Sequence, residues 1–355
     1  MRSRRNAGAM QQSKINSSVA ATPDGDRAQH GAIEIALVNN MPAQAMAATE
    51  AQFSRLLQAG AGVLPFRLRC YQLPGVPRST EIDQHLSETH ETIDRLYARG
   101  ADALIVTGAE PRATTLPDEP YWRDLTLLLD WARKNTVTAL WSCLAAHAAV
   151  LFLDGIERRR APQKFSGIYR FETNAGDLLM QGAGPTALVP HSRYNGLDQA
   201  ALVRRGYHIS AMSETAGSDL FWRREPSLFV FAQGHPEYFA NTLSREYRRD
   251  VLRFLSAQRN TYPVLPENYF SADTKRQLED LRQQAMGSPA PEYEETLDDI
   301  LSRENFELRW DNDAVRLYRN WFAIIRQATQ PATETNEADF HLKTNENDIP
   351  AAASS

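Results

Sequence analysis

Residues 137–152 read VTALWSCLAAHAAVLF, a short apolar run followed by an alanine-rich one. Val137 to Trp141 predicts a buried strand, and Ala145 to Phe152 predicts a helix. The chain turns from one to the other at Cys143. A strand that leads directly into a helix is the repeating unit of α/β folds. We therefore expect this segment to lie in a parallel sheet that helices cover on both faces.

The same alternation continues on both sides of this stretch. Patterns typical of strands occur at 33–38, 66–73 and 103–106, and patterns typical of helices at 46–59, 80–98, 119–134 and 240–257. Shorter β-like pieces between 164 and 230 predict added antiparallel strands, and a Trp-containing apolar pattern at 306–327 predicts a final helix. The expected fold class is α/β, with a mainly parallel sheet flanked by helices, added antiparallel strands and a C-terminal helical extension.

Composition changes along the chain predict its organisation. Residues 1–30 and 330–355 are polar and poor in large apolar side chains, so we expect two disordered tails. The basic start is followed by no apolar segment, so it does not resemble a secretory signal. Between the tails we expect a main domain at 31–260 and a C-terminal extension at 261–329. The charged stretch 271–305 is expected to leave the core.

Charge and hydropathy narrow the function classes. The chain has 39 Lys and Arg against 44 Asp and Glu, a net charge of −5. This balance argues against a general nucleic-acid binder, which needs a basic surface. No apolar run approaches the roughly 18 to 20 residues of a membrane span, so no integral membrane protein is expected.

The chain contains two cysteines, Cys70 and Cys143. Two are too few for a disulfide framework or a Cys-based zinc site, and they fit a reducing compartment. We expect a cytoplasmic protein with no metal and no permanently bound cofactor. Cys70 is expected to pack in the core.

Cys143 is the strongest candidate for a reacting group. A nucleophile on a strand-to-helix turn stands at the carboxyl edge of the sheet, where the helix N-terminus stabilises a thiolate. The alternative from local sequence is an inert core cysteine, because free cysteines are often buried.

Gly234-His235-Pro236-Glu237-Tyr238 follows an apolar strand pattern at 228–231. In extended chain His235 and Glu237 point to the same side, so the carboxylate can orient the imidazole. The alternative is a surface histidine beside a glutamate. Because the carboxyl ends of parallel strands meet at one edge, Cys143, His235 and Glu237 are expected to form a Cys–His–Glu triad.

A cysteine at such a turn, followed by His-Pro-Glu, resembles the class I glutamine amidotransferase-like fold. A set of ordered motifs resembles the homoserine O-succinyltransferase family more closely, over about residues 32–260. The motifs are Val38-Asn39-Asn40-Met41-Pro42 with Thr49-Glu50, Ile105-Val106-Thr107-Gly108-Ala109, Tyr121-Trp122, Pro190-His191-Ser192-Arg193-Tyr194, Gly234 to Tyr238, and Arg245 to Asp250.

The resemblance implies a mechanism and its substrates. An acyl-CoA, with succinyl-CoA favoured and acetyl-CoA as the alternative, acylates Cys143, and the hydroxyl of L-homoserine then attacks the thioester. His235 moves the protons and Glu237 orients it. The reaction opens methionine biosynthesis, with acyl-CoA as a co-substrate, and the resemblance also implies a homodimer.

The resemblance further assigns binding residues. Arg249 is expected to bind the homoserine carboxylate, and the backbone N–H groups of Leu144 and Ala109 are expected to form the oxyanion hole. Ser192, Arg193 and Lys164 match pocket positions, with a structural hydrogen bond or solvated charges as their alternatives. His147 is expected to pack beneath the turn, and His191 is expected to contact only the residues that surround the site.

Three departures from the family pattern bear on the donor. The stretch 43–48 lacks the lysine that the family carries there, Leu144 replaces a tryptophan, and Arg112 lies near the position thought to select the acyl group. A cation at Arg112 would suit a succinyl carboxylate, and the alternative is that it points to solvent. Other functions that remain open are a glutaminase-type amidotransferase, an acyltransferase for another amino acid, and a non-catalytic binding relative.

Overall fold

The computed structural model describes residues 31–77, 89–288, 290 and 292–329. Every helix and strand described below lies in the compact unit that begins at Ala32. The predicted tails at 1–30 and 330–355 lie outside the described residues.

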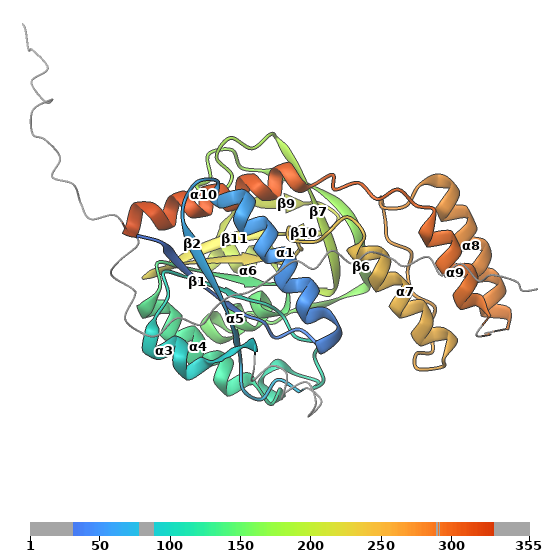
Figure 1. Cartoon of the computed structure of the whole chain (residues 1–355), viewed down its shortest axis with the longest axis horizontal. Coiled ribbons are helices and arrows are strands. Elements are labelled where there is room, and N and C mark those ends of the chain that lie inside the picture. Colours follow the sequence, from blue (N-terminus) through green and yellow to red (C-terminus); the bar gives the residue numbers. More distant parts are fainter. Residues whose placement is uncertain (1–30, 78–88, 289, 291, 330–355) are drawn as a thin grey trace, which may run out of the picture. The chain divides into compact units, whose positions relative to one another are not determined.

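An eight-stranded sheet forms the centre of this unit (Figure 1). The strands from β3 to β12 in the sheet order run parallel, and β11 and β8 add antiparallel pairs at one edge. The order is β3 (Glu91–Thr92), β2 (Phe66–Gln72), β1 (Ile33–Val38), β4 (Ala103–Val106), β5 (Thr138–Ser142), β12 (Ser227–Ala232), β11 (Leu220–Glu225) and β8 (His208–Ile209). The predicted parallel α/β sheet is therefore confirmed.

The strands β1, β4, β5 and β12 are buried along their whole length, because helices cover both faces of the sheet. The helices α1 (Ala43–Ala61) and α10 (Asp311–Thr329) contribute to the apolar cluster on one face. The other face packs against α3 (Ile93–Arg99), α4 (Trp122–Asn135), α5 (Leu144–Asp154) and α6 (Gln199–Arg204). A short 3-10 turn, η1 (Leu116–Asp118), precedes α4.

The predicted antiparallel strands form a second, four-stranded sheet. Its order is β10 (Gly217–Ser218), β9 (Ala211–Ser213), β6 (Arg159–Thr173) and β7 (Thr186–Gly196). The charged stretch 271–305 forms α8 (Ala272–Gly287) and α9 (Tyr293–Ser302), which share a small apolar cluster with α7 (Thr242–Leu255). This cluster is separate from the two that flank the sheet.

The prediction of one helix over 80–98 is wrong in the described part of that range. Glu91 and Thr92 pair with Tyr71 and Gln72 as the edge strand β3, and the helix begins only at Ile93. Pairing with the end of β2 satisfies backbone groups that a helix would have satisfied locally, so the tertiary contact overrides the helical spacing. Residues 78–88 lie outside the described residues.

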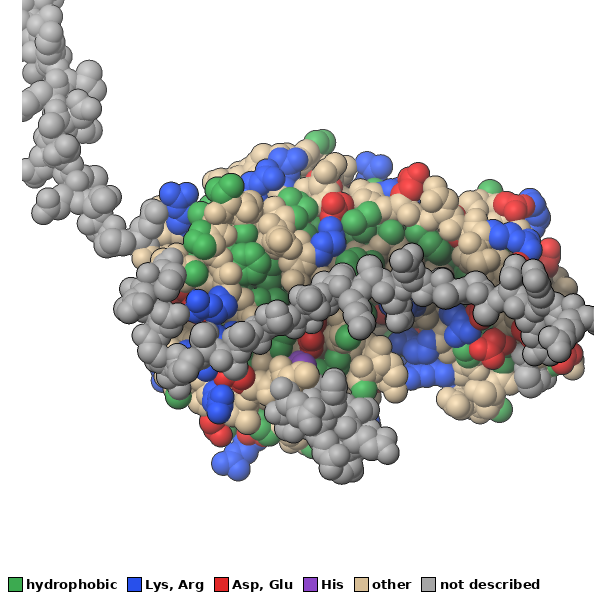
Figure 2. All heavy atoms as spheres, in the orientation of Figure 1, with side chains coloured by type: hydrophobic (Ala, Val, Ile, Leu, Met, Phe, Trp, Pro, Cys, Tyr) green, Lys and Arg blue, Asp and Glu red, His purple; other side chains and the backbone are tan. Residues whose placement is uncertain are grey.

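Acidic and basic side chains are interspersed on the face that Figure 2 shows. Some charged side chains of the described residues pair with one another, such as Arg248 Nη2 with Glu294 Oε1 at 2.9 Å. Among the helices that the structure describes, none is both long and apolar enough to cross a membrane.

Candidate active site

Cys143 sits on the tight turn between β5 and α5. Its backbone has φ 52° and ψ −113°, in a region that a residue with a side chain rarely adopts. The backbone N–H of Cys143 donates to the carbonyl of Ala232 at 2.7 Å, which fixes the turn against the end of β12. Strain held at one residue by such contacts is typical of a functional site. The predicted strand, turn and helix are all present, and the thiol is half-buried.

His235 comes from the next strand of the sheet. β12 pairs with β5 in parallel, with Ala232 opposite Ser142, so Cys143 and His235 follow neighbouring strand ends. The Nδ1 atom of His235 lies 2.8 Å from Oε1 of Glu237, and both side chains are buried. The topology thus brings together the three residues that the sequence proposed as a triad.

The protonation of His235 depends on both partners. Burial alone would lower its pKa, but the Glu237 carboxylate and the Cys143 sulfur, including a hydrogen bond to each, raise it well above the ordinary value of 6.5. Tyr238 stacks on the imidazole with ring centroids 4.3 Å apart. An imidazolium beside a cysteine sulfur is the pairing that activates cysteine nucleophiles.

A buried network beneath His235 holds its loop in place. The backbone N–H of Gly234 donates to Oδ1 of Asp219 at 2.7 Å. A Cβ on Gly234 would lie 2.6 Å from Val189 and 2.8 Å from both Asp219 and His191, so only glycine fits there. Burial raises the pKa of Asp219 to about 6. No sequence pattern pointed to Asp219, because its contact with Gly234 depends on the pairing of distant strands.

His147 lies under the turn, as the resemblance implied. Its Nε2 is 2.8 Å from Oε1 of Gln233, the residue before Gly234. Burial lowers the pKa of His147 to about 4, so the ring is neutral at pH 7. This contact joins the helix that follows the nucleophile to the loop that carries the base. His147 is a structural link between them and not a second base.

Backbone N–H groups lie close to the thiol. A Cβ on Gly108 would lie 3.0 Å from the backbone nitrogen of Leu144, so the loop after β4 passes directly over the start of α5. Asn40 holds this loop through bonds to the hydroxyl of Thr107 at 2.7 Å and to its carbonyl at 3.1 Å. The first N–H groups of a helix have no acceptor within the helix. The loop that leads to Ala109 therefore lies against Leu144, the residue that follows Cys143.

Arg249 and Lys164 meet at Asp250. Arg249 Nη2 lies 2.8 Å from Oδ1 of this buried carboxylate, and Lys164 Nζ lies 3.3 Å from Oδ2. The lysine is half-buried, whereas half of the Arg249 side chain is exposed. Two of the predicted binding residues therefore share one carboxylate that the sequence did not single out.

Arg193 is buried, and the alternative of a solvated charge is wrong for it. Its Nε donates to His191 Nδ1 at 3.0 Å, its Nη1 to the carbonyl of Asn195 at 2.6 Å, and its Nη2 to the carbonyl of Ala216. Ser192 is half-buried on β7, opposite Ser166 of β6. The contacts of Arg193 anchor the second sheet beneath the site.

Arg112 and a second arginine, Arg158, differ in placement. Arg112 is exposed, and its Nη2 donates to the carbonyl of Pro77 at 3.3 Å. Arg158 is half-buried, and its Nη1 is buried without a hydrogen-bond partner in the described part of the chain. Burial lowers the pKa of Arg158, while charges on Tyr121, Glu119 and Cys143 oppose this. Arg158, which sequence reasoning missed, is thus a cation within electrostatic reach of the thiol.

Comparisons with known proteins agree with these motifs. A family model described as "HTS: Homoserine O-succinyltransferase" matches residues 6–331. A homoserine O-succinyltransferase of Rhodopseudomonas palustris is 46% identical over 299 residues, which cover 84% of this chain and 89% of that protein. One of Bradyrhizobium japonicum is 44% identical, covering 88% of this chain and 96% of that protein. A solved glutamine amidotransferase of Thermotoga maritima is 12% identical with a TM-score of 0.45, covering 84% and 99% of the two chains. The family match and the identities to these relatives show that the chain belongs to the homoserine O-succinyltransferase family.

Proposed function

We propose that the protein transfers a succinyl group from succinyl-CoA to the hydroxyl of L-homoserine through a thioester on Cys143. The observation that carries the proposal is Cys143 on a strained strand-to-helix turn, beside the strand end that carries the buried His235–Glu237 pair. The relatives from Rhodopseudomonas palustris and Bradyrhizobium japonicum carry the name of this reaction. Acylation of homoserine would make the protein the enzyme that opens methionine biosynthesis.

The first half-reaction acylates the enzyme. The Cys143 thiolate attacks the thioester carbonyl, and the resulting oxyanion accepts hydrogen bonds from the N–H groups of Leu144 and Ala109. The C–S bond to CoA then breaks, and the departing sulfur takes the proton of the His235 imidazolium. CoA leaves as a thiol, and the neutral imidazole remains beside the new thioester.

The second half-reaction regenerates the thiolate. Neutral His235 accepts the proton of the homoserine hydroxyl as its oxygen attacks the thioester. Collapse of the tetrahedral intermediate expels the Cys143 thiolate and releases O-succinylhomoserine. Glu237 holds the imidazolium at 2.8 Å and stabilises its charge at each step.

Arg249 binds the homoserine carboxylate in this proposal. Its guanidinium is oriented by Asp250, and half of the side chain is open to a ligand. A planar guanidinium forms paired hydrogen bonds with a carboxylate, which fixes the orientation of the substrate as well as its affinity. Ser192 and Lys164 complete the polar lining.

Arg158 supports succinyl over acetyl as the transferred group. A succinyl group ends in a carboxylate, and the unpartnered Nη1 of Arg158 offers it a buried donor with a positive charge. An acetyl group has nothing for that donor to bind. Arg112, which the resemblance suggested for this task, is exposed and donates to the carbonyl of Pro77.

Steady-state kinetics with both donors test the proposal. We expect a kcat/KM for succinyl-CoA above that for acetyl-CoA, and parallel double-reciprocal plots that mark a ping-pong mechanism. Arg158→Gln should lower kcat/KM for succinyl-CoA about 10-fold or more and leave that for acetyl-CoA nearly unchanged, whereas Arg112→Gln should alter neither. Glutamine hydrolysis without acyl-CoA would replace this function with an amidotransferase-type one.

A further inference from the structure

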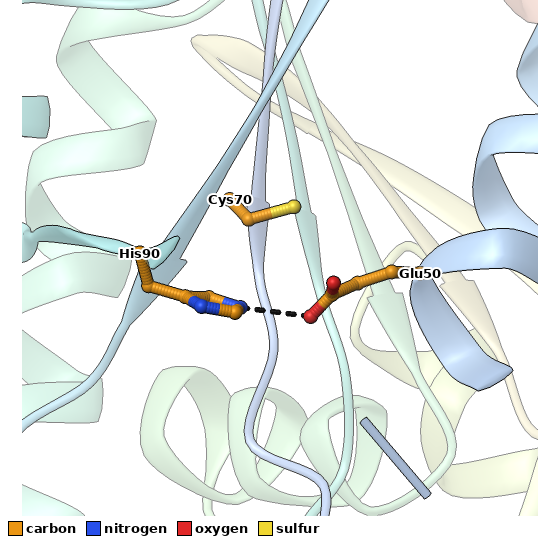
Figure 3. Close-up of side chains that lie close together, drawn as sticks. All are labelled: Glu50, Cys70 and His90. Carbon is orange, nitrogen blue, oxygen red and sulfur yellow. Dashed lines mark hydrogen bonds and ion pairs between the residues drawn. The ribbon is translucent and has the colours of Figure 1, made fainter. Parts of the chain in front are cut away.

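A second set of Cys, His and Glu side chains lies away from the reacting groups described above. Glu50 comes from α1, Cys70 from β2, and His90 from the segment directly before β3. One ligand atom from each residue lies within 4.8 Å of the other two. Figure 3 shows the carboxylate of Glu50 and the ring of His90 pointing toward one another, with the Cys70 sulfur beside them. Within residues 31–77, 89–288 and 292–329, no other group of three such side chains meets this distance.

The ligand types suit a borderline-soft cation. Thiolate, imidazole and carboxylate together are typical of zinc-class transition metals, whereas calcium and magnesium prefer oxygen ligands alone. A tetrahedral zinc site keeps its ligand atoms about 3.5 Å apart, given bond lengths near 2.0–2.3 Å. The 2.7 Å contact between His90 Nε2 and Glu50 Oε1 would open by less than about 1 Å to admit the ion.

Neighbouring groups already orient two of the ligands. The Nδ1 atom of His90 lies 2.9 Å from the hydroxyl of Thr89, which leaves Nε2 facing Glu50 and Cys70. Asn39 Nδ2 donates to Oε1 of Glu50 at 2.9 Å. Partners of this kind fix the ring orientation of metal-bound histidines and the position of bound carboxylates.

The Glu50 carboxylate supplies a negative charge at the cluster, beside the sulfur of Cys70 and the ring of His90. Coordination of a dication deprotonates a thiol, so Cys70 would bind the ion as a thiolate.

We propose that Glu50, Cys70 and His90 bind one zinc-class divalent metal ion per chain, with a water molecule as the fourth ligand. We expected no metal from the sequence because two cysteines cannot form a Cys-based site, but a mixed site needs only one cysteine. The ion joins α1 to β2 and to the segment before β3, near one edge of the sheet, so it stabilises the fold there. This inference does not depend on the proposed acyl transfer.

Cobalt(II) is the probe for this site, because thiolate ligation to cobalt gives an intense near-ultraviolet charge-transfer band. Full-length protein with Cys143→Ser, which leaves Cys70 as the sole thiol, is stripped with chelator and titrated with cobalt(II). We expect a band that saturates at one ion per chain and is displaced by zinc. The band should vanish with Cys70→Ser, and affinity should fall at least about 10-fold with His90→Gln. His208→Gln, an exposed histidine elsewhere, should leave binding unchanged.

Thermal unfolding of otherwise unaltered protein provides the second readout. Zinc should raise the Tm by several degrees in wild type and have no effect in Cys70→Ser, because a ligand bound only to the folded state stabilises it. Absence of the band and of the Tm shift would overturn the proposal. Binding of equal affinity in Cys70→Ser would overturn it too.

Discussion

Replacing Glu237 by Gln removes a charge that lies 2.8 Å from His235 Nδ1 without changing the shape of the side chain. Both side chains are buried, so solvent screens their interaction little. A hydrogen bond to a charged group contributes about 1.5–3 kcal/mol, and each 1.36 kcal/mol is tenfold in rate. We therefore expect the acylation of Cys143 to slow by about 10- to 100-fold.

The same substitution should also move the pH dependence. Burial lowers the pKa of His235, and the Glu237 carboxylate is the larger of the two opposing charges. Without it the pKa falls, so the imidazolium that protonates departing CoA is lost at lower pH. The alkaline limb of the acylation rate should shift to lower pH in Glu237→Gln.

Single-turnover release of CoA, followed across pH in wild type and variant, checks both expectations. Glu279→Gln on the exposed face of α8 is the matched control and should behave as wild type. An unchanged rate together with an unchanged pH profile in Glu237→Gln would refute the assignment of Glu237 as the partner of His235.

Three further substitutions test other parts of the site. Gly234→Ala places a Cβ 2.6–2.8 Å from three neighbours, so it should displace His235 and lower the activity about 100-fold. Gly287→Ala is the control and should leave the activity unchanged, because nothing lies within 4 Å of the added Cβ. The His147 pKa of about 4 in the folded protein lies below the unfolded value near 6.5, so the free energy of unfolding of wild type should fall by roughly 3 kcal/mol as the pH falls from 6.5 to 4. His147→Gln should remove this part of the pH dependence, measured by urea unfolding at several pH values. An equal slope in the variant would contradict that role. Arg249→Lys should raise the KM for homoserine about 10-fold with little change in kcat, and an unaltered KM would exclude Arg249 from carboxylate binding.

The parts of the fold that follow from local pattern were predictable. The runs at 33–38 and 103–106 are apolar and fully buried because parallel strands are covered on both faces, so sequence alone located them. Strand β3 was missed because Glu91 and Thr92 have no strand pattern of their own. They become a strand only by pairing with the end of β2, a contact between residues about 20 positions apart.

Among the site residues too, some follow from local sequence patterns and others depend on contacts between distant elements. Cys143 and His235 could be found because each follows a recognisable strand and because parallel strands bring their carboxyl ends together. Asp219 and Arg158 could not be found, since their roles arise from contacts across different elements. Cys70 was correctly expected to pack against the core, but its proximity to Glu50 and His90 depends on how α1 and β3 are placed around β2.

The central claim is that Cys143 carries the acyl group between donor and acceptor. Intact-mass analysis after incubation with succinyl-CoA alone tests it most directly, with Cys143→Ala as the comparison and Cys70→Ser as the control for the other thiol. We predict that wild type and Cys70→Ser gain the mass of one succinyl group, located on Cys143, and lose it when homoserine is added. A protein that forms O-succinylhomoserine without any adduct on Cys143, or a Cys143→Ala variant that retains the activity, would contradict the account.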